Sequence, residues 1–495
     1  MTEDVDVAGF ARSFETFLER FREALPPPSS TLRRLAEEHL GVDPSGLPSY
    51  TERLDPSEHA NLQLAFDALL SGRDDWTLLG LPAELHHFGD FSLASILGGR
   101  FHGPSEPCAP QFVRVPVDVD RTLPCLRLGV YLLAFDGAAL VVLAGFSEGH
   151  GPRPGLLLDV VAADADHAAR FVAHVRQLMH ERNVFRGKVL SFAFSEWGGF
   201  GITFHSLPEI PRDAVVLPEA DLDAIERHTV GVSRNAGALL AAGRHLKRGL
   251  LLYGPPGTGK TLSVMYLCGQ LPGRTTLLLS GPGAGALGQA AAIARSLQPS
   301  MIVLEDVDLV AMERTMPGMG TNPLLFQLLN EMDGLGDDAD VVFVLTTNRV
   351  ELLEPALAAR PGRIDQAVEI GLPDPACRTR LLELYLRDTD FAGGDLNGLV
   401  EATDGVTASF VKELVRRAVL VAAVERGRED DDTSPPVTVT HLEAALDDLL
   451  HHSAPILRSS LGMTPGVAEG AVDADPAESG GWFAYAPRTG LTFDD

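Results

Sequence analysis

A glycine-rich octapeptide in the middle of the chain constrains the fold more than any other feature. It reads Gly-Pro-Pro-Gly-Thr-Gly-Lys-Thr at residues 254–261 and follows the apolar run Gly-Leu-Leu-Leu-Tyr at 249–253. The octapeptide satisfies the pattern G-x-x-x-x-G-K-[ST] in full, at a place where a strand is expected to lead into a helix. Strand and helix patterns alternate over residues 249–371, which predicts a doubly wound α/β domain with a parallel sheet.

The residue types in this loop suit a nucleoside triphosphate. Glycines let the loop curl so that backbone N–H groups point at phosphate oxygens. A lysine supplies positive charge for the β- and γ-phosphates, a threonine hydroxyl can ligate Mg²⁺, and the following helix adds its dipole. The alternative, an ordinary Gly-rich turn, is disfavoured by the strand before it and the apolar helix after it. The predicted binding residues are Gly254, Pro255, Pro256, Gly257, Thr258, Gly259, Lys260, Thr261 and Leu262, with Lys260 also catalytic and Thr261 also a metal ligand.

A chain of 495 residues is too long for one core and predicts about three domains. Helical periodicity comes first, with helices expected near 31–40 and 57–71. Strand-like runs around one helix at 165–182, the last of them at 188–194 and 200–205, then indicate a small α+β domain. Five buried strands are expected at 249–253, 275–279, 301–304, 341–345 and 367–370, and helices follow from 373. The boundaries we expect are 1–75 (helical segment), 76–210 (α+β domain), 211–372 (α/β core), 373–457 (helical domain) and 458–495 (disordered acidic tail).

Charge and composition indicate which partners the protein binds and in which cellular compartment we expect it. The formal net charge is −28, which disfavours general affinity for nucleic acid. The four cysteines form no C-x-x-C pair, and the acidic N-terminus has no apolar signal core, so we expect a cytoplasmic protein with reduced thiols. The apolar stretch 125–145 is broken by Arg127 and by Asp136-Gly137. We therefore expect a β-hairpin there, and no membrane span.

A second group of polar residues follows the octapeptide at the ends of two expected strands. The run Ile-Val-Leu-Glu-Asp at 302–306 ends in two carboxylates, one suited to hold Mg²⁺ (Glu305) and the next to polarise an attacking water (Asp306). The strand at 341–345 leads to Asn348, whose amide can orient the same water. Arg360 and Arg363 flank a Pro-Gly turn further on and are placed to reach a neighbour's phosphate. Acidic strand ends, polar strand tips and Arg-rich turns are each common in proteins. Their occurrence in this order after such a loop is improbable by chance.

Together these motifs make residues 215–455, about half the chain, resemble an AAA-family ATPase module. The resemblance rests on 254–261, Glu305-Asp306, Thr346-Thr-Asn-Arg349, Arg360-Pro-Gly-Arg363 and the helix-like stretch 324–335. It implies ATP hydrolysis with Mg²⁺ at the subunit interfaces of a homo-oligomeric ring, usually a hexamer. It also implies that Asn348 is a sensor, that Arg360 and Arg363 act in trans, and that the helical domain is a lid whose turn 403–409 lies near the nucleotide.

Four features depart from that family's pattern. The usual Asp-Glu pair is reversed to Glu305-Asp306, an order similar to that of the mitochondrial AAA translocases that export the folded Rieske protein. Because Asp306 is one methylene shorter than Glu, we expect slow hydrolysis. The arginine loop carries an extra Ala, which leaves open which arginine reaches the phosphate. The segment 280–287 lacks the aromatic pore residue of unfolding motors, and the lid turn has Ala408-Ser409 in place of Gly-Ala.

The sequence supports three functions to different degrees. The first is an ATP-driven remodeller or translocase of a protein partner, which the N-terminal domain selects. The second is a nucleotide-gated scaffold or assembly switch with slow hydrolysis. A DNA-acting ATPase is disfavoured because the N-terminal region has no basic patch. His180-Glu181 is not followed by a second His in H-E-x-x-H spacing, so no fused protease is expected. The first 210 residues are closest to the N-terminal parts of bacterial AAA proteins of unassigned role, and they do not identify the partner.

Overall fold

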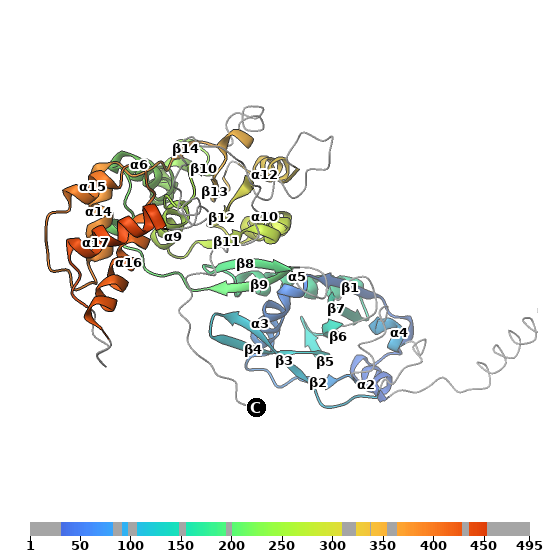
Figure 1. The fold of residues 1–495 in the computed structure, drawn as a ribbon. Helices are drawn as coiled ribbons and strands as arrows, with labels where there is room; N and C mark the ends of the chain where they lie inside the picture. The colour runs from blue at the N-terminus through green and yellow to red at the C-terminus, as the bar shows by residue number, and fades with distance from the viewer. Residues whose placement is uncertain are drawn as a thin grey trace, which may run out of the picture. The chain divides into compact units, whose positions relative to one another are not determined.

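The chain divides into two compact units, Met1–Val184 and Phe185–Asp495. The computed structural model describes residues 31–82, 92–97, 106–147, 155–194, 200–308, 323–336, 338–353, 364–427 and 435–452. Figure 1 shows that the first unit combines a sheet with helices and that the second continues from strands into a helical region. The units are described separately below.

The first unit is built on a five-stranded antiparallel sheet. Its strand order is β1-β7-β6-β5-β2, where the strands are β1 (Ser49–Leu54), β7 (Gly155–Ala162), β6 (Ala138–Ser147), β5 (Leu128–Phe135) and β2 (Trp76–Gly80). A separate ribbon pairs β3 (Phe112–Asp118) with β4 (Arg121–Leu126). Asp136 and Gly137 have φ of 49° and 79° and form the turn between β5 and β6, so the predicted hairpin is confirmed.

Helices cover both faces of this sheet. Tyr131 and Leu133 of β5 belong to a core with α3 (His59–Leu70) and α5 (Ala165–Glu181), whereas Val130 and Leu132 belong to a core with α2 (Thr31–Leu40) and α4 (Leu93–Leu97). Successive strand residues point to opposite faces, so a strand buried on both faces must be apolar throughout. This burial explains the long apolar stretch that contains β5 and β6.

The first boundary predicted from the sequence, at residue 75, does not separate two structural units. The helices expected near 31–40 and 57–71 are present as α2 and α3, but both pack on the five-stranded sheet. The sequence analysis also missed β1 and β2. These are the two outermost strands of that sheet, and β1 is mostly exposed, so their hydrophobic pattern is weak.

The second unit contains the predicted parallel sheet. Its order is β14-β10-β13-β12-β11-β8-β9, where the first five strands are β14 (Gln366–Glu369), β10 (Arg248–Tyr253), β13 (Val341–Thr347), β12 (Ser300–Leu304) and β11 (Thr275–Leu279). These five confirm the strands expected from the apolar runs. Met301 and Val303 share a core with α6 (Glu219–Glu226) and α9 (Lys260–Gln270), and Ile302 is fully buried on the other face. α10 (Leu287–Ser296) contacts β11 and β12, and α12 (Pro323–Asp333) contacts α10.

The prediction that residues up to 210 belong to the N-terminal α+β domain is wrong for its last two strands. β8 (Val189–Phe194) pairs in parallel with β11, and β9 (Phe200–His205) pairs antiparallel with β8. Both strands therefore extend the sheet of the second unit. An apolar run predicts a strand but not its partner, because the pairing is made with residues far away in the sequence.

A helical region with its own core follows the sheet, as predicted. It comprises α14 (Pro375–Leu386), α15 (Asn397–Ala402), α16 (Ala408–Arg426) and α17 (Val439–Asp447). Phe410, Val411 and Leu414 of α16 are buried in this core together with residues of α14 and α17. The side chains of Thr407 and Asp374 accept backbone N–H bonds at the starts of α16 and α14, which satisfies groups that helix ends leave unpaired.

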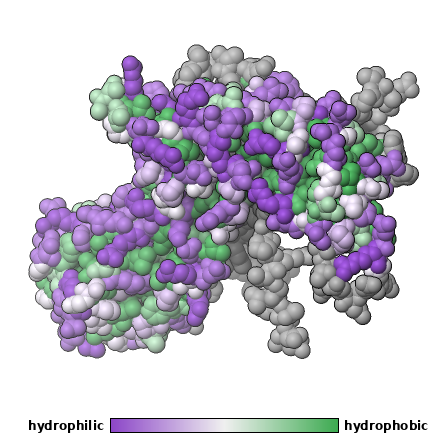
Figure 2. Space-filling view, turned by 90° about the vertical axis from the view of Figure 1, so that its left-hand side faces the viewer, coloured by the Kyte–Doolittle hydropathy of each residue, from purple (hydrophilic) through white to green (hydrophobic). Residues whose placement is uncertain are grey.

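The cysteines form no disulfide, and the face of the surface shown in Figure 2 is mainly hydrophilic. All four cysteines are free, Cys108 being exposed and Cys125, Cys268 and Cys377 buried. Among the residues that the structure describes, no helix is long and apolar enough to cross a membrane. On the face shown in Figure 2, hydrophilic residues prevail and hydrophobic ones appear in patches between them. The disordered tail predicted from 458 lies outside the described residues.

Candidate nucleotide site

The Gly-rich loop between β10 and α9 adopts a conformation that only glycine accommodates at three places. Gly254, Gly257 and Gly259 have φ of 144°, 78° and 109°. A Cβ on Gly254 would lie 2.2 Å from the carbonyl oxygen of Ile370. Thr258 Oγ1 donates a hydrogen bond to the carbonyl oxygen of Pro255 at 2.9 Å, which links two residues within the loop. The glycines of the motif are therefore required by backbone geometry, and the loop leads directly into the N-terminus of α9.

Lys260 lies buried at the start of α9, with a side chain folded back over the loop. Its Nζ donates to the carbonyl oxygens of Gly254 and Pro255 at 2.8 and 2.7 Å. The residue is only 6% exposed, and burial lowers the pKa of its ammonium group to about 8, against the opposing effect of Asp306 and Asp308. A buried ammonium group at the N-terminus of a helix is suited to bind an anion.

The two carboxylates predicted at the end of β12 lie beside this loop. Glu305 is 4% exposed, and its backbone N–H donates to Leu279 on β11 at 2.9 Å. Asp306 follows with a φ of 48°, a left-handed conformation that Asp tolerates better than most residues. Burial and the negative charge of Asp308 raise the pKa of Asp306, while Lys260 opposes the shift. This edge of the sheet therefore carries more negative than positive charge.

Asn348 is brought to Asp306 by the pairing of β12 with β13. Its Nδ2 donates to Asp306 Oδ1 at 3.2 Å, and Thr346 Oγ1 accepts the backbone N–H of Asp306 at 3.0 Å. Forty-two residues separate Asn348 from Asp306, but parallel strands end at the same edge of a sheet. The structure thus brings Lys260, Asp306 and Asn348 together at one edge of the sheet.

Asp308, two residues beyond the predicted carboxylates, was given no role in the sequence analysis. It is 2% exposed and accepts hydrogen bonds from Thr347 Oγ1 at 2.8 Å and from the backbone N–H of Asn348 at 3.2 Å. The sequence feature that could have identified Asp308 as a site residue is its position, two residues after Asp306 and just beyond a buried strand.

The start of α16 lies against the Gly-rich loop. The backbone N–H of Ser409 donates to the carbonyl of Gly257 at 3.0 Å, and a Cβ on Gly257 would approach Ser409 Oγ and Thr407 Oγ1 to 3.0 and 3.2 Å. The expectation that the turn 403–409 lies beside the nucleotide loop is therefore confirmed for its last residues.

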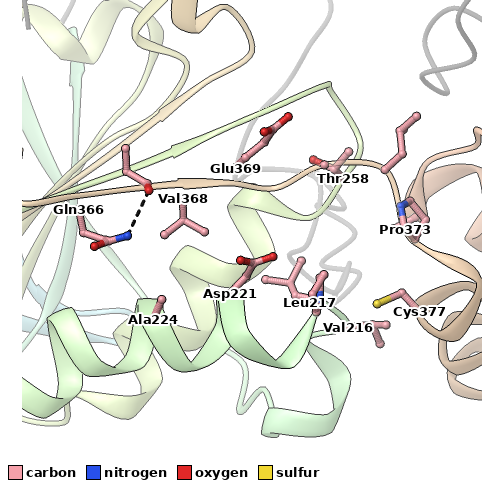
Figure 3. A pocket seen from close by; sticks show the side chains of 15 residues that line it. Val216, Leu217, Asp221, Ala224, Thr258, Gln366, Val368, Glu369, Pro373 and Cys377 are labelled. Atoms are coloured by element: carbon pink, nitrogen blue, oxygen red, sulfur yellow. Dashed lines mark hydrogen bonds between the residues drawn. The ribbon is translucent and has the colours of Figure 1, made fainter.

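A cavity of about 380 Å³ opens beside Thr258. Figure 3 shows side chains reaching it from the segment before and within α6, from β14, from the Gly-rich loop and from the start of α14. Its apolar walls include Val216, Leu217, Val368 and Cys377, and Asp221 and Glu369 add carboxylates. The sequence analysis missed this cavity, because residues that are far apart in the chain form it. Its volume and mixed lining suit a small planar ligand next to the phosphate loop.

The segment 280–287, where an aromatic pore residue is missing, packs against β8. Gly281–Ala286 form a short 3-10 turn, η6, in which Ala284 and Ala286 are 1% and 2% exposed. A Cβ on Gly283 would lie 2.5 Å from the carbonyl oxygen of Phe192 in β8. β8, which extends the sheet, therefore holds this segment in place. Of the remaining predicted site residues, Arg360 and Arg363 lie outside the residues that the structure describes.

The donor set of the site fits Mg²⁺ bound together with phosphates. Thr261 is exposed at the first turn of α9, and Glu305 adds carboxylate oxygens, which are the hard ligands that this cation prefers. The described part of the chain has no group of three His, Cys, Asp or Glu that could hold a metal ion by itself. Mg²⁺ usually keeps few protein ligands and binds largely through water and the nucleotide.

Comparisons with known proteins agree with this geometry. Residues 250–372 match the family model described as "ATPase family associated with various cellular activities (AAA)". The "ATP-dependent zinc metalloprotease FtsH" of Mycobacterium tuberculosis is 33% identical over 272 residues, which are 51% of this chain and 35% of that protein. "FtsH 4" of Sphaerobacter thermophilus is 35% identical over 224 residues, 42% of this chain and 34% of that protein. The chain thus covers about a third of the length of these relatives.

The family match covers the loop, the carboxylates at the end of β12 and Asn348, which are the residues that the structure brings together. The parallel sheet and the helical region after it are the fold that such a domain requires. Residues 250–372 therefore form an ATPase domain of the AAA family.

Proposed function

We propose that this protein binds ATP with Mg²⁺, hydrolyses it, and uses the cycle to remodel or translocate a protein partner. One observation carries the proposal: Lys260, Asp306 and Asn348 meet at the carboxyl edge of the parallel sheet, beside the nucleotide loop. The domain match and the FtsH relatives support ATP as the ligand.

Each residue of the site has a separate role in the proposed hydrolysis. The loop N–H groups and Lys260 hold the β- and γ-phosphates, and Thr261 and Glu305 hold the cation, which offsets phosphate charge. Asp306 accepts a proton from the attacking water, since its raised pKa makes it a better base than an exposed Asp. Asn348 donates to Asp306 and orients it. The base of the nucleotide occupies the cavity beside Thr258.

The assembly we propose is a homo-oligomeric ring, a hexamer, in which Arg360 and Arg363 of one subunit reach the phosphate bound by the next. The first unit of the chain selects the protein partner, and the protein acts in the cytoplasm. The zinc metalloprotease activity in the relatives' name is not part of the proposal, because the family match covers residues 250–372 and the chain covers only about a third of those relatives.

A second function, a nucleotide-gated scaffold or assembly switch with slow hydrolysis, is favoured by two observations. Asp306 is one methylene shorter than Glu at the base position, although the Glu-Asp order resembles that of the mitochondrial Rieske-protein translocases. The segment 281–286 is packed against β8, so it is not placed as a free loop to grip an extended chain. If the protein remodels its partner, we expect that residues 281–286 do not grip or thread the partner's chain.

Two measurements separate these functions. ATP turnover that a partner from the native cell extract stimulates, and that Asp306→Asn abolishes, supports a remodeller. ATP-dependent ring assembly that persists in Asp306→Asn, with negligible turnover in the wild type, supports a switch. The Asp306→Asn protein also serves as the trap for the partner, because it holds ATP without turning it over. Absence of ATP binding to the wild-type protein would overturn both proposals.

A further inference from the structure

Asp308 lies buried at the carboxyl edge of the seven-stranded sheet of the second unit, which we call the ATPase sheet. The mechanism proposed above assigns no role to this residue. One oxygen of its side chain, Oδ1, accepts a hydrogen bond from the Thr347 hydroxyl at 2.8 Å and one from the Asn348 backbone N–H at 3.2 Å. The side chain is 2% exposed, so water does not compete for these bonds. A single carboxylate oxygen thus holds two consecutive residues at the end of β13.

Asn348 is consequently fixed at two points. Asp308 holds its main chain, and its side-chain amide donates to Asp306 Oδ1 at 3.2 Å. In the opposite direction, the Asp306 backbone N–H donates to Thr346 Oγ1 at 3.0 Å. The ends of β12 and β13 are therefore joined by side-chain bonds that run both ways, beyond the last backbone pairing at Leu304 and Leu345.

The same bonds extend to the nucleotide loop. The carbonyl oxygen of Thr347 accepts the backbone N–H of Gly254 at 3.3 Å, and its hydroxyl oxygen accepts the backbone N–H of Arg349 at 3.0 Å. Thr347, which Asp308 holds, is thus in direct contact with the first residue of the loop.

We propose that Asp308 is a positioning residue for ATP hydrolysis: it fixes the main chain of Asn348 so that the Asn348 amide meets Asp306 and the attacking water. This inference rests on the ATPase function proposed above. Preorganised polar groups contribute to catalysis only while they are held in place, and a displacement of about 1 Å can lower the rate about a hundredfold. Without Asp308, Asn348 keeps its side chain but loses the bond that sets its position.

The first test compares Asp308→Ala with Asp308→Asn in steady-state ATPase assays of the full chain. We expect Asp308→Ala to lower kcat by about tenfold or more with little change in KM, since Asn348 acts on the water and not on nucleotide binding. Asp308→Asn keeps an oxygen acceptor for the same two donors and should recover most of the rate. Equal losses in both variants would overturn the positioning role, because they would show that the charge of Asp308 matters and its acceptor geometry does not.

The second test is a double-mutant cycle with Asn348→Ala. If Asp308 acts through Asn348, Asp308→Ala should change kcat little once Asn348 is already Ala. Independent, multiplicative losses in the double variant would overturn the inference. Asp340→Ala is the matched control: Asp340 lies at the other end of β13, where it pairs with Arg274 at 2.8 Å, so its loss should lower thermal stability and leave kcat unchanged.

A third variant covers the case in which Asp308→Ala does not fold. Thr347→Val keeps the shape of the side chain and removes the hydroxyl, which donates to Asp308 and accepts the backbone N–H of Arg349. We expect a severalfold lower kcat at unchanged KM, and wild-type kcat in a folded Thr347→Val protein would count against the inference. A wild-type protein that binds but does not hydrolyse ATP would refute the proposed ATPase function itself, which keeps the two failures distinguishable.

Discussion

The packing of Gly283 against β8 gives the sharpest stability prediction. A Cβ at this position would lie 2.5 Å from the Phe192 carbonyl oxygen, whereas real Cβ atoms essentially never come closer than 3.0 Å, so Gly283→Ala must separate the two by at least 0.5 Å (3.0 − 2.5). Phe192 cannot easily yield, because β8 is paired with β9 on one side and β11 on the other. Overpacking of this kind costs about 1–3 kcal/mol, which corresponds to a melting temperature lower by roughly 2–12 °C.

The assay is thermal unfolding of the full chain, with hydrogen exchange to locate the effect. Exchange should rise at residues 189–194 and 281–286 and stay unchanged in the first unit of the chain. Gly269→Ala in α9 is the matched control, because a Cβ there meets nothing within 4 Å and Ala favours a helix by up to about 1 kcal/mol. If Gly283→Ala melts at the wild-type temperature with unchanged exchange, the segment does not pack on β8 and the argument against threading fails.

The remaining predictions concern the nucleotide site and the thiols. Lys260→Ala should abolish ATP binding, since it removes the charge that faces the phosphates; titration with a fluorescent ATP analogue checks this, and unchanged affinity would contradict the loop assignment. Asp306→Asn should keep ATP affinity within a few fold and lower turnover by about a hundredfold or more, measured by phosphate release; wild-type turnover would remove Asp306 from the base role. Burial raises the pKa of Cys125 to about 12 and of Cys377 to about 11, so both remain neutral thiols at pH 8, and iodoacetamide followed by mass spectrometry should label exposed Cys108 first. These raised values also mean that both thiols keep their protons in the folded state when the unfolded state loses them, so their contribution to the free energy of unfolding should fall as pH rises above about 9. The check compares the wild type with a Cys125→Ser/Cys377→Ser variant, and identical slopes between pH 8.5 and 11 would refute this.

The strands of the ATPase sheet were predictable because burial on both faces makes them apolar throughout. β12 and β13 are buried at every residue, and such runs stand out in a sequence. β1 was missed because it is an edge strand with a single buried position. β8 and β9 were recognised as strands but assigned to the wrong unit, because strand propensity does not specify which sheet edge a strand joins.

The candidate site shows the same division. The Gly-rich loop carries its residues within eight consecutive positions, so the motif alone located Lys260 and Thr261 at the junction of the loop and α9. Asp308 was overlooked because acidic residues at strand ends are common, and its partners Thr347 and Asn348 lie about forty residues away. Nothing local distinguishes a buried carboxylate that holds another residue from one that faces solvent.

By itself, the sequence determined which local elements form and where the nucleotide loop lies, since both follow from periodicity and from the backbone freedom of glycine. Only the tertiary structure decided that β8 and β9 extend the ATPase sheet and hold the segment 281–286, that α16 touches Gly257, and that a cavity opens beside Thr258. The physical reason is that these features depend on hydrogen bonds and packing between segments far apart in the chain, whose free energy exists only once the segments have been brought together.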